Sequence, residues 1–143
     1  MSSILISGGT GLIGSEVAAH LTQLGYTIKV LTRRPTDIAQ NQYNWNLTKG
    51  EIDPKAWEGT EYVINLAGSS IIGGRWTNKR KKELISSRVD ATNLLVKTIQ
   101  QNNIPIQHFI QASAMGYYGD SGDQELTEDS PAGNDFMAKL CVD

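Results

Sequence analysis

Residues 4–14 read Ile-Leu-Ile-Ser-Gly-Gly-Thr-Gly-Leu-Ile-Gly, an apolar run that gives way to a glycine-rich turn. The pattern of residues 12–24 predicts an amphipathic helix that begins before the last of these glycines, Gly14. This order suits the pyrophosphate of a dinucleotide, because the turn is tight, no Cβ keeps the backbone from the phosphates, and the helix N-terminus points at their charge. We therefore predict a nucleotide-binding turn here, and not a plain strand–helix connection.

The glycines of this turn support two spacings. Gly9, Gly11 and Gly14 give the usual dinucleotide pattern GxGxxG, whereas Gly8, Gly11 and Gly14 give GxxGxxG, the form used by short-chain dehydrogenases/reductases. With either spacing the phosphates come closest at Gly11, and Gly14 lets the helix pack against the first strand. The cofactor-binding residues predicted in this segment are Gly8, Gly9, Thr10, Gly11, Leu12 and Ile13.

The residues after the second predicted strand bear on the choice between NAD and NADP. NAD sites usually place an Asp or Glu there for the ribose 2′-hydroxyl, but this chain reads Thr32-Arg33-Arg34 and has no acid before Asp37. Guanidinium groups bind a phosphate through paired hydrogen bonds, whereas a carboxylate repels it. We predict that Thr32, Arg33 and Arg34 bind the cofactor and that NADP is favoured over NAD. The competing interpretation is a pair of solvated arginines.

The composition bounds the class of protein. The chain has 143 residues, a formal net charge of −2 and one cysteine, which is enough for one core and excludes an internal disulfide. The acidic pI of about 5.7 argues against nucleic acid as the main partner. No apolar run approaches the ~18 residues of a transmembrane helix, and the N-terminal run is too short for a signal peptide. We expect a cytoplasmic protein with a small-molecule partner and no membrane contact.

Strands and helices alternate along the chain. Strands are predicted at 3–7, 26–32, 42–46, 61–67 and 107–113, and helices at 12–24 and 77–102, with a last helix near the chain end. This alternation predicts an α/β fold, a Rossmann-type doubly wound parallel sheet in strand order 3-2-1-4-5.

The end of the sequence bears on domain organisation. A doubly wound dinucleotide domain usually has six strands, and residues 137–143 read as a helix in progress. We therefore expect 1–143 to be an incomplete NADP-binding Rossmann domain, truncated before its last strands, with the C-terminal substrate lobe missing. Alone it is expected to be inactive and to self-associate through surfaces left uncovered by truncation, on strand five and around Leu84.

Several segments together resemble the extended short-chain dehydrogenase/reductase family, which includes nucleotide-sugar epimerases and dehydratases. They are Gly-Gly-Thr-Gly-Leu-Ile-Gly (8–14), Asn-Leu-Ala-Gly (65–68), Ser-Ala-Met-Gly-Tyr-Tyr-Gly (113–119) and Leu-Thr-Glu-Asp-Ser-Pro (126–131). Three further segments resemble more narrowly an epimerase-like subfamily of poorly defined activity. They are Ile-Ile-Gly-Gly-Arg-Trp (71–76), Ser-Arg (87–88) and Asp-Phe-Met-Ala-Lys-Leu-Cys (135–141). The resemblance implies that Leu66, Ala67 and Gly68 line the adenosine and pyrophosphate side of the cofactor. It also implies that Ala112 and Ser113 lie beneath the nicotinamide.

The chain departs from that family at the catalytic positions. The family uses Tyr-x-x-x-Lys, in which the tyrosine is the acid/base, but none of the five tyrosines here has a lysine four residues later. At the corresponding place the chain has Asp135 and Lys139, whose spacing predicts an ion pair on a helix face. Arg88 stands where relatives carry an asparagine.

Three residues remain as catalytic candidates. Ser113 matches the family's serine, and Tyr117 and Tyr118 follow it closely enough to move a proton in place of the missing tyrosine. The alternative role of the two tyrosines is packing within a turn.

Charged runs flank these motifs. Five cations lie close together at the start of the long predicted helix: Arg75, Lys79, Arg80, Lys81 and Lys82. Either they are solvated side chains at a helix end, or they bind an anionic substrate or the phosphates of the cofactor. The acids of 120–129 have no histidine partner and fit no calcium loop, so we expect no metal site.

These patterns lead to two hypotheses. The first is an NADP-binding, epimerase/dehydratase-like oxidoreductase that acts on a sugar nucleotide or another small polar substrate. The alternative is a non-catalytic NADP-binding sensor or scaffold protein, which the missing Tyr-x-x-x-Lys favours.

Overall fold

The computed structural model describes residues 2–72 and 74–143 of the chain. These divide into two compact units, Met1–Gln111 and Ala112–Asp143, and each is described by itself. Within the described residues, no helix has the length and apolar character needed to cross a bilayer.

The first unit is built on a six-stranded sheet. The strands are β1 (Ser3–Ser7), β2 (Thr27–Thr32), β3 (Gln42–Asn46), β4 (Glu51–Ile52), β5 (Thr60–Asn65) and β6 (His108–Gln111). They lie in the order β4-β3-β2-β1-β5-β6, and every pair is parallel except β3 and β4. The central strand is β1, whose Ile6 is paired with Val30 on one side and Ile64 on the other.

The sheet confirms the α/β class and corrects the strand count. The five predicted strands lie in the predicted relative order, but the sheet has a sixth strand, β4, beyond the third. It was missed because a two-residue antiparallel pairing, Trp45 to Ile52 and Asn46 to Glu51, is too short to produce a periodic pattern. The strands predicted at 61–67 and 107–113 also end earlier, at Asn65 and Gln111.

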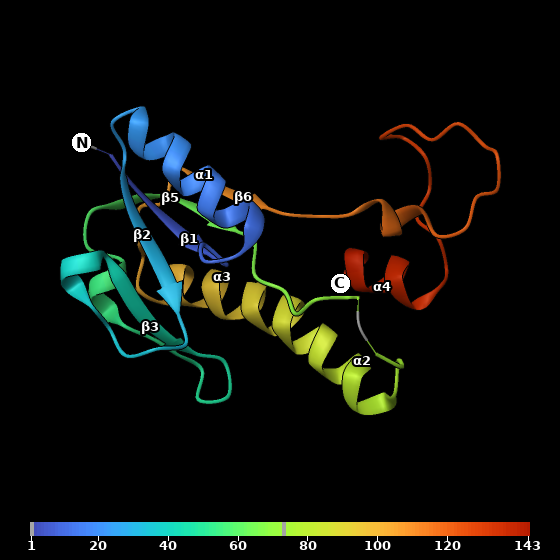
Figure 1. Ribbon diagram of the computed structural model, residues 1–143, viewed down its shortest axis with the longest axis horizontal. Coiled ribbons are helices and arrows are strands. Elements are labelled where there is room, and N and C mark those ends of the chain that lie inside the picture. The colour runs from blue at the N-terminus through green and yellow to red at the C-terminus, as the bar shows by residue number, and fades with distance from the viewer. Residues whose placement is uncertain (1, 73) are drawn as a thin grey trace. The chain divides into compact units, whose positions relative to one another are not determined.

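Helices cover both faces of this sheet. Figure 1 shows α1 (Leu12–Gln23) on one face and α3 (Ala91–Gln101) on the other. Opposite faces are required because right-handed crossovers lead from β1 to β2 in one direction and from β5 to β6 in the other. The helix predicted at 77–102 is confirmed as a continuous helical segment, but it contains a π-helical turn that was not predicted. The segment consists of α2 (Asn78–Ile85), the π-helical turn η3 (Ser86–Asp90) and α3.

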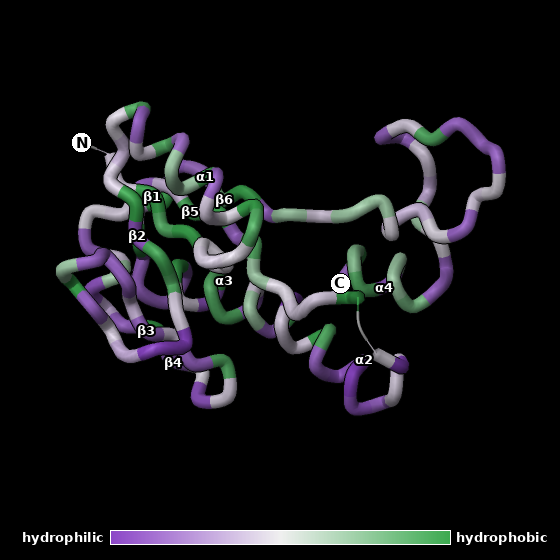
Figure 2. Tube along the Cα trace, in the orientation of Figure 1, coloured by the Kyte–Doolittle hydropathy of each residue, from purple (hydrophilic) through white to green (hydrophobic). Residues whose placement is uncertain are grey.

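The core lies between the sheet and α3. Leu5 and Val63 of the central strands pack there with Ala91 and Leu95, all fully buried. Because side chains alternate along a strand, Ile4 and Ile6 point to the opposite face, toward α1. Figure 2 shows the contrast between the hydrophobic β1 and the mostly hydrophilic α2. The sheet and α3 therefore supply the hydrophobic core, whereas α2 is mostly hydrophilic (Figure 2).

A buried lysine ties β2 to the turn that precedes β5. Lys29 donates from Nζ to the backbone oxygens of Lys55 at 3.2 Å and Ala56 at 3.3 Å, and also to that of Glu58. These carbonyls belong to the end of η2 (Pro54–Ala56) and the residues after it. Burial lowers the pKa of Lys29 below its ordinary value, and the nearby Glu58 carboxylate opposes that shift. The ammonium group thus donates hydrogen bonds to carbonyls at a helix end, where no further helical turn supplies N–H donors.

The second unit consists of η4 (Met115–Tyr118), a loop and α4 (Phe136–Val142). The ion pair predicted between Asp135 and Lys139 is wrong for the described structure. Asp135 precedes the helix, and its Oδ1 accepts a hydrogen bond from Ala138 N at 2.8 Å, so the carboxylate is the N-cap of α4.

We predict that Lys29→Met destabilises the protein by about 1–3 kcal/mol, because the carbonyls at the end of η2 lose their donor. The free energy of unfolding is measured by urea denaturation. Lys97→Met on the exposed side of α3 is the matched control and is expected to change it by less than about 0.5 kcal/mol. Equal stability of the two variants would contradict the role given to Lys29.

Candidate functional site

Three glycines of the turn, Gly8, Gly9 and Gly14, have no room for a Cβ. Gly8 has φ +72°, and a Cβ on it would lie 2.7 Å from the backbone oxygen of Leu66. A Cβ on Gly14 would lie 2.2 Å from Gly8 O, and one on Gly9 would lie 2.9 Å from Val30 Cγ1. The two spacings found in the sequence therefore describe one structure, since Gly8 and Gly9 are both required for steric reasons.

The start of α1 is open to an anion. Gly11 is its N-cap and provides no side-chain hydrogen bond, so the amides of the first turn have no side-chain cap. The side chains of Leu12 and Ile13 are 86% and 66% exposed. Thr10 and Gly11 are exposed as well. This helix start fits a phosphate group for three reasons: the amides of its first turn have no side-chain cap, the helix dipole is positive there, and the glycines have no Cβ atoms.

A buried amide connects this turn to the neighbouring strand ends. Asn65 is fully buried, and its Oδ1 accepts hydrogen bonds from Ser7 Oγ and, at 3.3 Å, from Ala67 N. Its Nδ2 donates to Thr92 Oγ1 at 3.0 Å and to Gln111 Oε1 at 2.8 Å. One side chain thus links the ends of β1, β5 and β6 to α3, and it fixes the direction in which the chain leaves β5.

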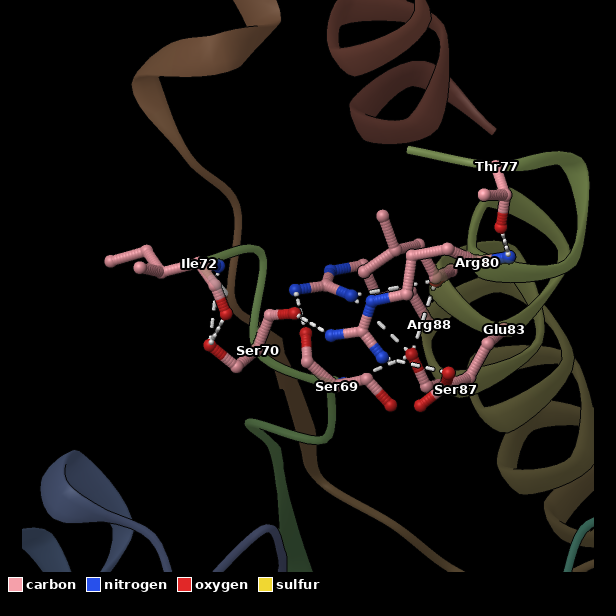
Figure 3. Close-up of polar contacts among 9 residues, drawn as sticks. Ser69, Ser70, Ile72, Thr77, Arg80, Glu83, Ser87 and Arg88 are labelled. Carbon is pink, nitrogen blue, oxygen red and sulfur yellow. Dashed lines mark hydrogen bonds and ion pairs between the residues drawn. The ribbon is translucent and has the colours of Figure 1, made fainter. Parts of the chain in front are cut away.

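The loop after β5, residues 66–72, is held from the other side by two arginines. Arg80 donates to the backbone oxygen of Ser70, and Arg88 Nη2 donates to that of Ser69 at 3.0 Å (Figure 3). The Ser87 hydroxyl accepts from Ser69 N at 3.0 Å. Because Arg80 is on α2 and Arg88 on η3, these bonds set the distance between that helical segment and the loop.

Gly68 lies directly against the side chain of Arg88. A Cβ at this position would lie 2.9 Å from Cζ of Arg88, so the guanidinium rests directly on the loop backbone. The π-helical turn that carries Arg88 shifts its side chains relative to an α-helix, and such turns often occur at functional sites.

The acidic residue of this cluster is neutralised. Glu83 Oε2 lies 2.7 Å from Arg80 Nη1, and both residues are drawn in Figure 3. The hydrogen bond from Arg80, and after it one from the Ser69 side chain, holds the pKa of Glu83 below its usual value. Glu83 is therefore a carboxylate whose charged form is favoured by its ion pair with Arg80.

A cavity of about 560 Å³ lies within the first unit, and Ser69, Glu83 and Ser87 are among the residues that line it. One wall comes from the ends of β2 and β3, with Arg33, Asn46 and Leu47, and the other from α2 and η3, with Lys82, Glu83 and Ser86. Its volume is in the range of small-molecule sites. Of the cofactor residues predicted after β2, Arg33 lines this cavity.

The two neighbours of Arg33 have other positions. Thr32 is buried, and its Oγ1 accepts a hydrogen bond from Arg34 N at 3.2 Å, which shapes the turn after β2. Arg34 is exposed and does not line the cavity.

The remaining predicted residues lie in the second unit. Ala112 and Ser113 are exposed and follow β6 instead of lying on a strand, because β6 ends at Gln111. Tyr117 and Tyr118 are part of η4, half-buried, with their rings edge to face at 5.1 Å. The backbone of this unit is also tight, since a Cβ on Gly133 would lie 2.6 Å from Tyr118 O.

Residues that support the site were missed in the sequence. The anchoring role of Asn65 could have been inferred from an amide at the end of an otherwise apolar strand. The contacts of Arg80 and Ser87 with the loop had no signal, because they depend on where a helix lies relative to a distant turn.

Comparison with known proteins finds a protein family and individual relatives that are similar to this chain. The sequence pattern of the NAD dependent epimerase/dehydratase family matches residues 4–142. The epimerase family protein Mb2239 of Mycobacterium bovis is 36% identical over 141 residues, 98% of this chain and 46% of the relative. YfhF of Bacillus subtilis is 37% identical over 139 residues, 95% of this chain and 46% of the relative.

A solved structure agrees with these matches. The crystal structure of human epimerase family protein SDR39U1 with NADPH superposes with a TM-score of 0.84 at 29% identity, covering 98% of this chain and 46% of that one. The chain spans about half the length of the curated relatives it matches.

We predict that Gly14→Ala lowers the free energy of unfolding by about 1–3 kcal/mol. Alanine favours a helix over glycine by up to about 1 kcal/mol, but its Cβ would require the Gly8 carbonyl or α1 to move. Thermal unfolding measures the effect, with Ala19→Ser on the exposed side of α1 as the control. A variant more stable than the wild type would show that the turn has room for a side chain.

Proposed function

The chain belongs to the NAD dependent epimerase/dehydratase family, and we propose that it binds NADP(H) as the cofactor-binding part of an epimerase/dehydratase-like oxidoreductase. The observation that carries this proposal is the turn from Gly8 to Gly14, where a Cβ is excluded at Gly8, Gly9 and Gly14 and the first amides of α1 have no side-chain cap. A pyrophosphate is the group that such a turn accommodates.

The adenosine end of the cofactor is proposed to occupy the cavity beside α2. The cavity lies at the carboxyl ends of β2 and β3, on the side of the sheet where ligands of doubly wound folds bind. Leu66, Ala67 and Gly68 leave β5 toward the glycine turn and, in this proposal, line the path from the adenosine to the pyrophosphate.

The choice of NADP over NAD is proposed from Arg33. It lines the cavity, and the first acid after β2 is Asp37, beyond the turn. A guanidinium attracts a 2′-phosphate, whereas a carboxylate at the end of β2 would repel it. The presence of NADPH in the structure of human SDR39U1 supports this choice.

The proposed chemistry concerns a protein with the full length of the relatives. The bound cofactor would supply hydride transfer, with a sugar nucleotide or another small polar molecule as the substrate. We propose that Ala112 and Ser113 lie at the nicotinamide end and that Tyr117 or Tyr118 moves the proton. The Tyr-x-x-x-Lys pair is absent, and the carboxylate of Asp135 is occupied as a helix cap.

The same absence favours a second candidate, a non-catalytic NADP-binding sensor or scaffold protein. The two functions differ in one measurable respect, the turnover of NADPH. A protein with the full length of the relatives, assayed against sugar nucleotides and aldehydes, oxidises NADPH only if it is an enzyme.

For NADP selection, we predict that Arg33→Ala weakens NADPH binding by roughly tenfold and changes NADH binding less than twofold, because only NADPH carries the 2′-phosphate. Isothermal titration calorimetry measures both dissociation constants. Lys49→Ala removes an exposed cation that does not line the cavity, and it is expected to leave both unchanged. Equal affinity of the wild type for the two cofactors would overturn the proposed NADP preference.

For catalysis, we predict that Tyr117→Phe or Tyr118→Phe, in a protein with the full length of the relatives, lowers kcat by roughly 10²-fold, the usual effect of losing a proton donor. The melting temperature identifies a variant that fails only through packing, since both rings are in mutual contact. Full turnover in both variants would remove the tyrosines from the mechanism.

A further inference from the structure

Two cations from different elements of the fold line the same cavity. Arg33 is at the end of β2, and Lys82 is on α2, more than a third of the chain further on; both line the cavity of about 560 Å³. Lys82 is exposed. In the sequence it is one of five crowded cations, and the structure separates it from the others.

Two arginines and the glutamate near this cavity are already engaged. Arg80 pairs with Glu83 at 2.7 Å and donates to Ser70 O, and Arg88 donates to Ser69 O at 3.0 Å. By contrast, across the described residues neither the Arg33 guanidinium nor the Lys82 ammonium has a hydrogen bond or an ion pair. Two cations without protein partners on one cavity favour an anionic ligand over a neutral one.

Hydroxyl groups beside these cations extend the site. Ser86 lies one helical turn after Lys82 and lines the cavity from the same wall, and Thr48 lines it from the opposite side. The structure records no hydrogen bond of either hydroxyl among the residues it describes, whereas the hydroxyl of Ser87 is bonded to Ser69 N and Leu84 O. A phosphate offers several acceptor oxygens, which suits a mixture of cations and hydroxyl donors.

The carboxylate on the cavity wall does not cancel this charge. Glu83 is paired with Arg80 and also bonded by the Ser69 side chain. The pair contributes no net charge, so Arg33 and Lys82 determine the sign of the potential in the cavity.

We infer that Lys82 of α2, with the Ser86 hydroxyl beside it, forms the second half of the 2′-phosphate site and holds that phosphate opposite Arg33. This inference rests on the proposed binding of NADP. It adds a specificity-determining residue on a helix, whereas the sequence pattern places this choice only at the end of β2.

The loop contacts explain how a helical lysine can act with a strand residue. Arg80 and Arg88 fix α2 and η3 to the loop at Ser69 and Ser70, and that loop leaves the central sheet at β5 (Figure 3). The position of Lys82 relative to Arg33 is therefore set by hydrogen bonds and not by the helix alone. A fixed helix lowers part of the cost of binding an anion, although the exposed Lys82 side chain still loses rotamer freedom when it binds.

The test compares two probes that differ only in the 2′-phosphate, adenosine 2′,5′-bisphosphate and adenosine 5′-monophosphate. Binding of each to the chain is measured by calorimetry for the wild type, Lys82→Gln, Lys82→Arg and Lys79→Gln. Lys79→Gln is the matched control, because it removes the same charge from the same helix at a residue that does not line the cavity.

We expect Lys82→Gln to weaken bisphosphate binding by roughly tenfold and to change monophosphate binding less than twofold. Lys82→Arg should restore most of the loss, and Lys79→Gln should bind both probes like the wild type. Ser86→Ala should weaken only the bisphosphate, by roughly threefold.

Two results would overturn the inference alone. In one, the wild type prefers the bisphosphate and Lys82→Gln keeps that preference. In the other, Lys79→Gln loses as much as Lys82→Gln, which would mean a diffuse charge effect and no local contact. A wild type that binds the two probes equally, or neither, would instead overturn the proposed NADP binding, so the two failures are distinguishable.

Discussion

The first unit depends on one close approach of backbone to backbone. The turn at Gly8 lies so near the end of β5 that a Cβ would be 2.7 Å from Leu66 O, and α1 begins so near the turn that a Cβ on Gly14 would be 2.2 Å from Gly8 O. This contact aims the N-terminus of α1 across the carboxyl edge of the sheet. Asn65 holds the same edge from beneath, by hydrogen bonds to β1, β6 and α3. The phosphate-binding geometry therefore follows from the packing of the central strands.

The second determinant of the site is the connection from β5 to α3. The chain leaves the sheet, forms the loop of residues 66–72 and returns through α2 and the π-helical turn. Arg80 and Arg88 bind this helical segment back to the loop. As a result α2, which is mostly hydrophilic (Figure 2), is held by these polar contacts as well as by its buried Leu84, and it forms one wall of the cavity. In a chain whose catalytic tyrosine–lysine pair is absent, these features support cofactor binding more directly than they support chemistry.

Local signals in the sequence predicted much of the fold. The apolar run of β1, the glycines after it and the spacing of the strands gave the α/β sheet, since each depends on residues close together in the chain. The missed features have different causes. The strand β4 is too short for a pattern, and the π-helical turn differs from an α-helix by one residue per turn, which hydrophobic spacing does not resolve. Asp135 was assigned to an ion pair because spacing alone does not reveal where a helix starts.

The sequence by itself determined where a phosphate can approach the backbone, because the absence of a Cβ at Gly8, Gly11 and Gly14 is a property of those residues. It also determined that no carboxylate stands at the end of β2. Only the tertiary structure decided that Arg33 and Lys82 share a cavity while Arg80 and Arg88 are occupied by the loop. The reason is physical: a run of cations carries the same charge whichever way each side chain points, and only the packing of a helix against a sheet selects the one that faces a ligand.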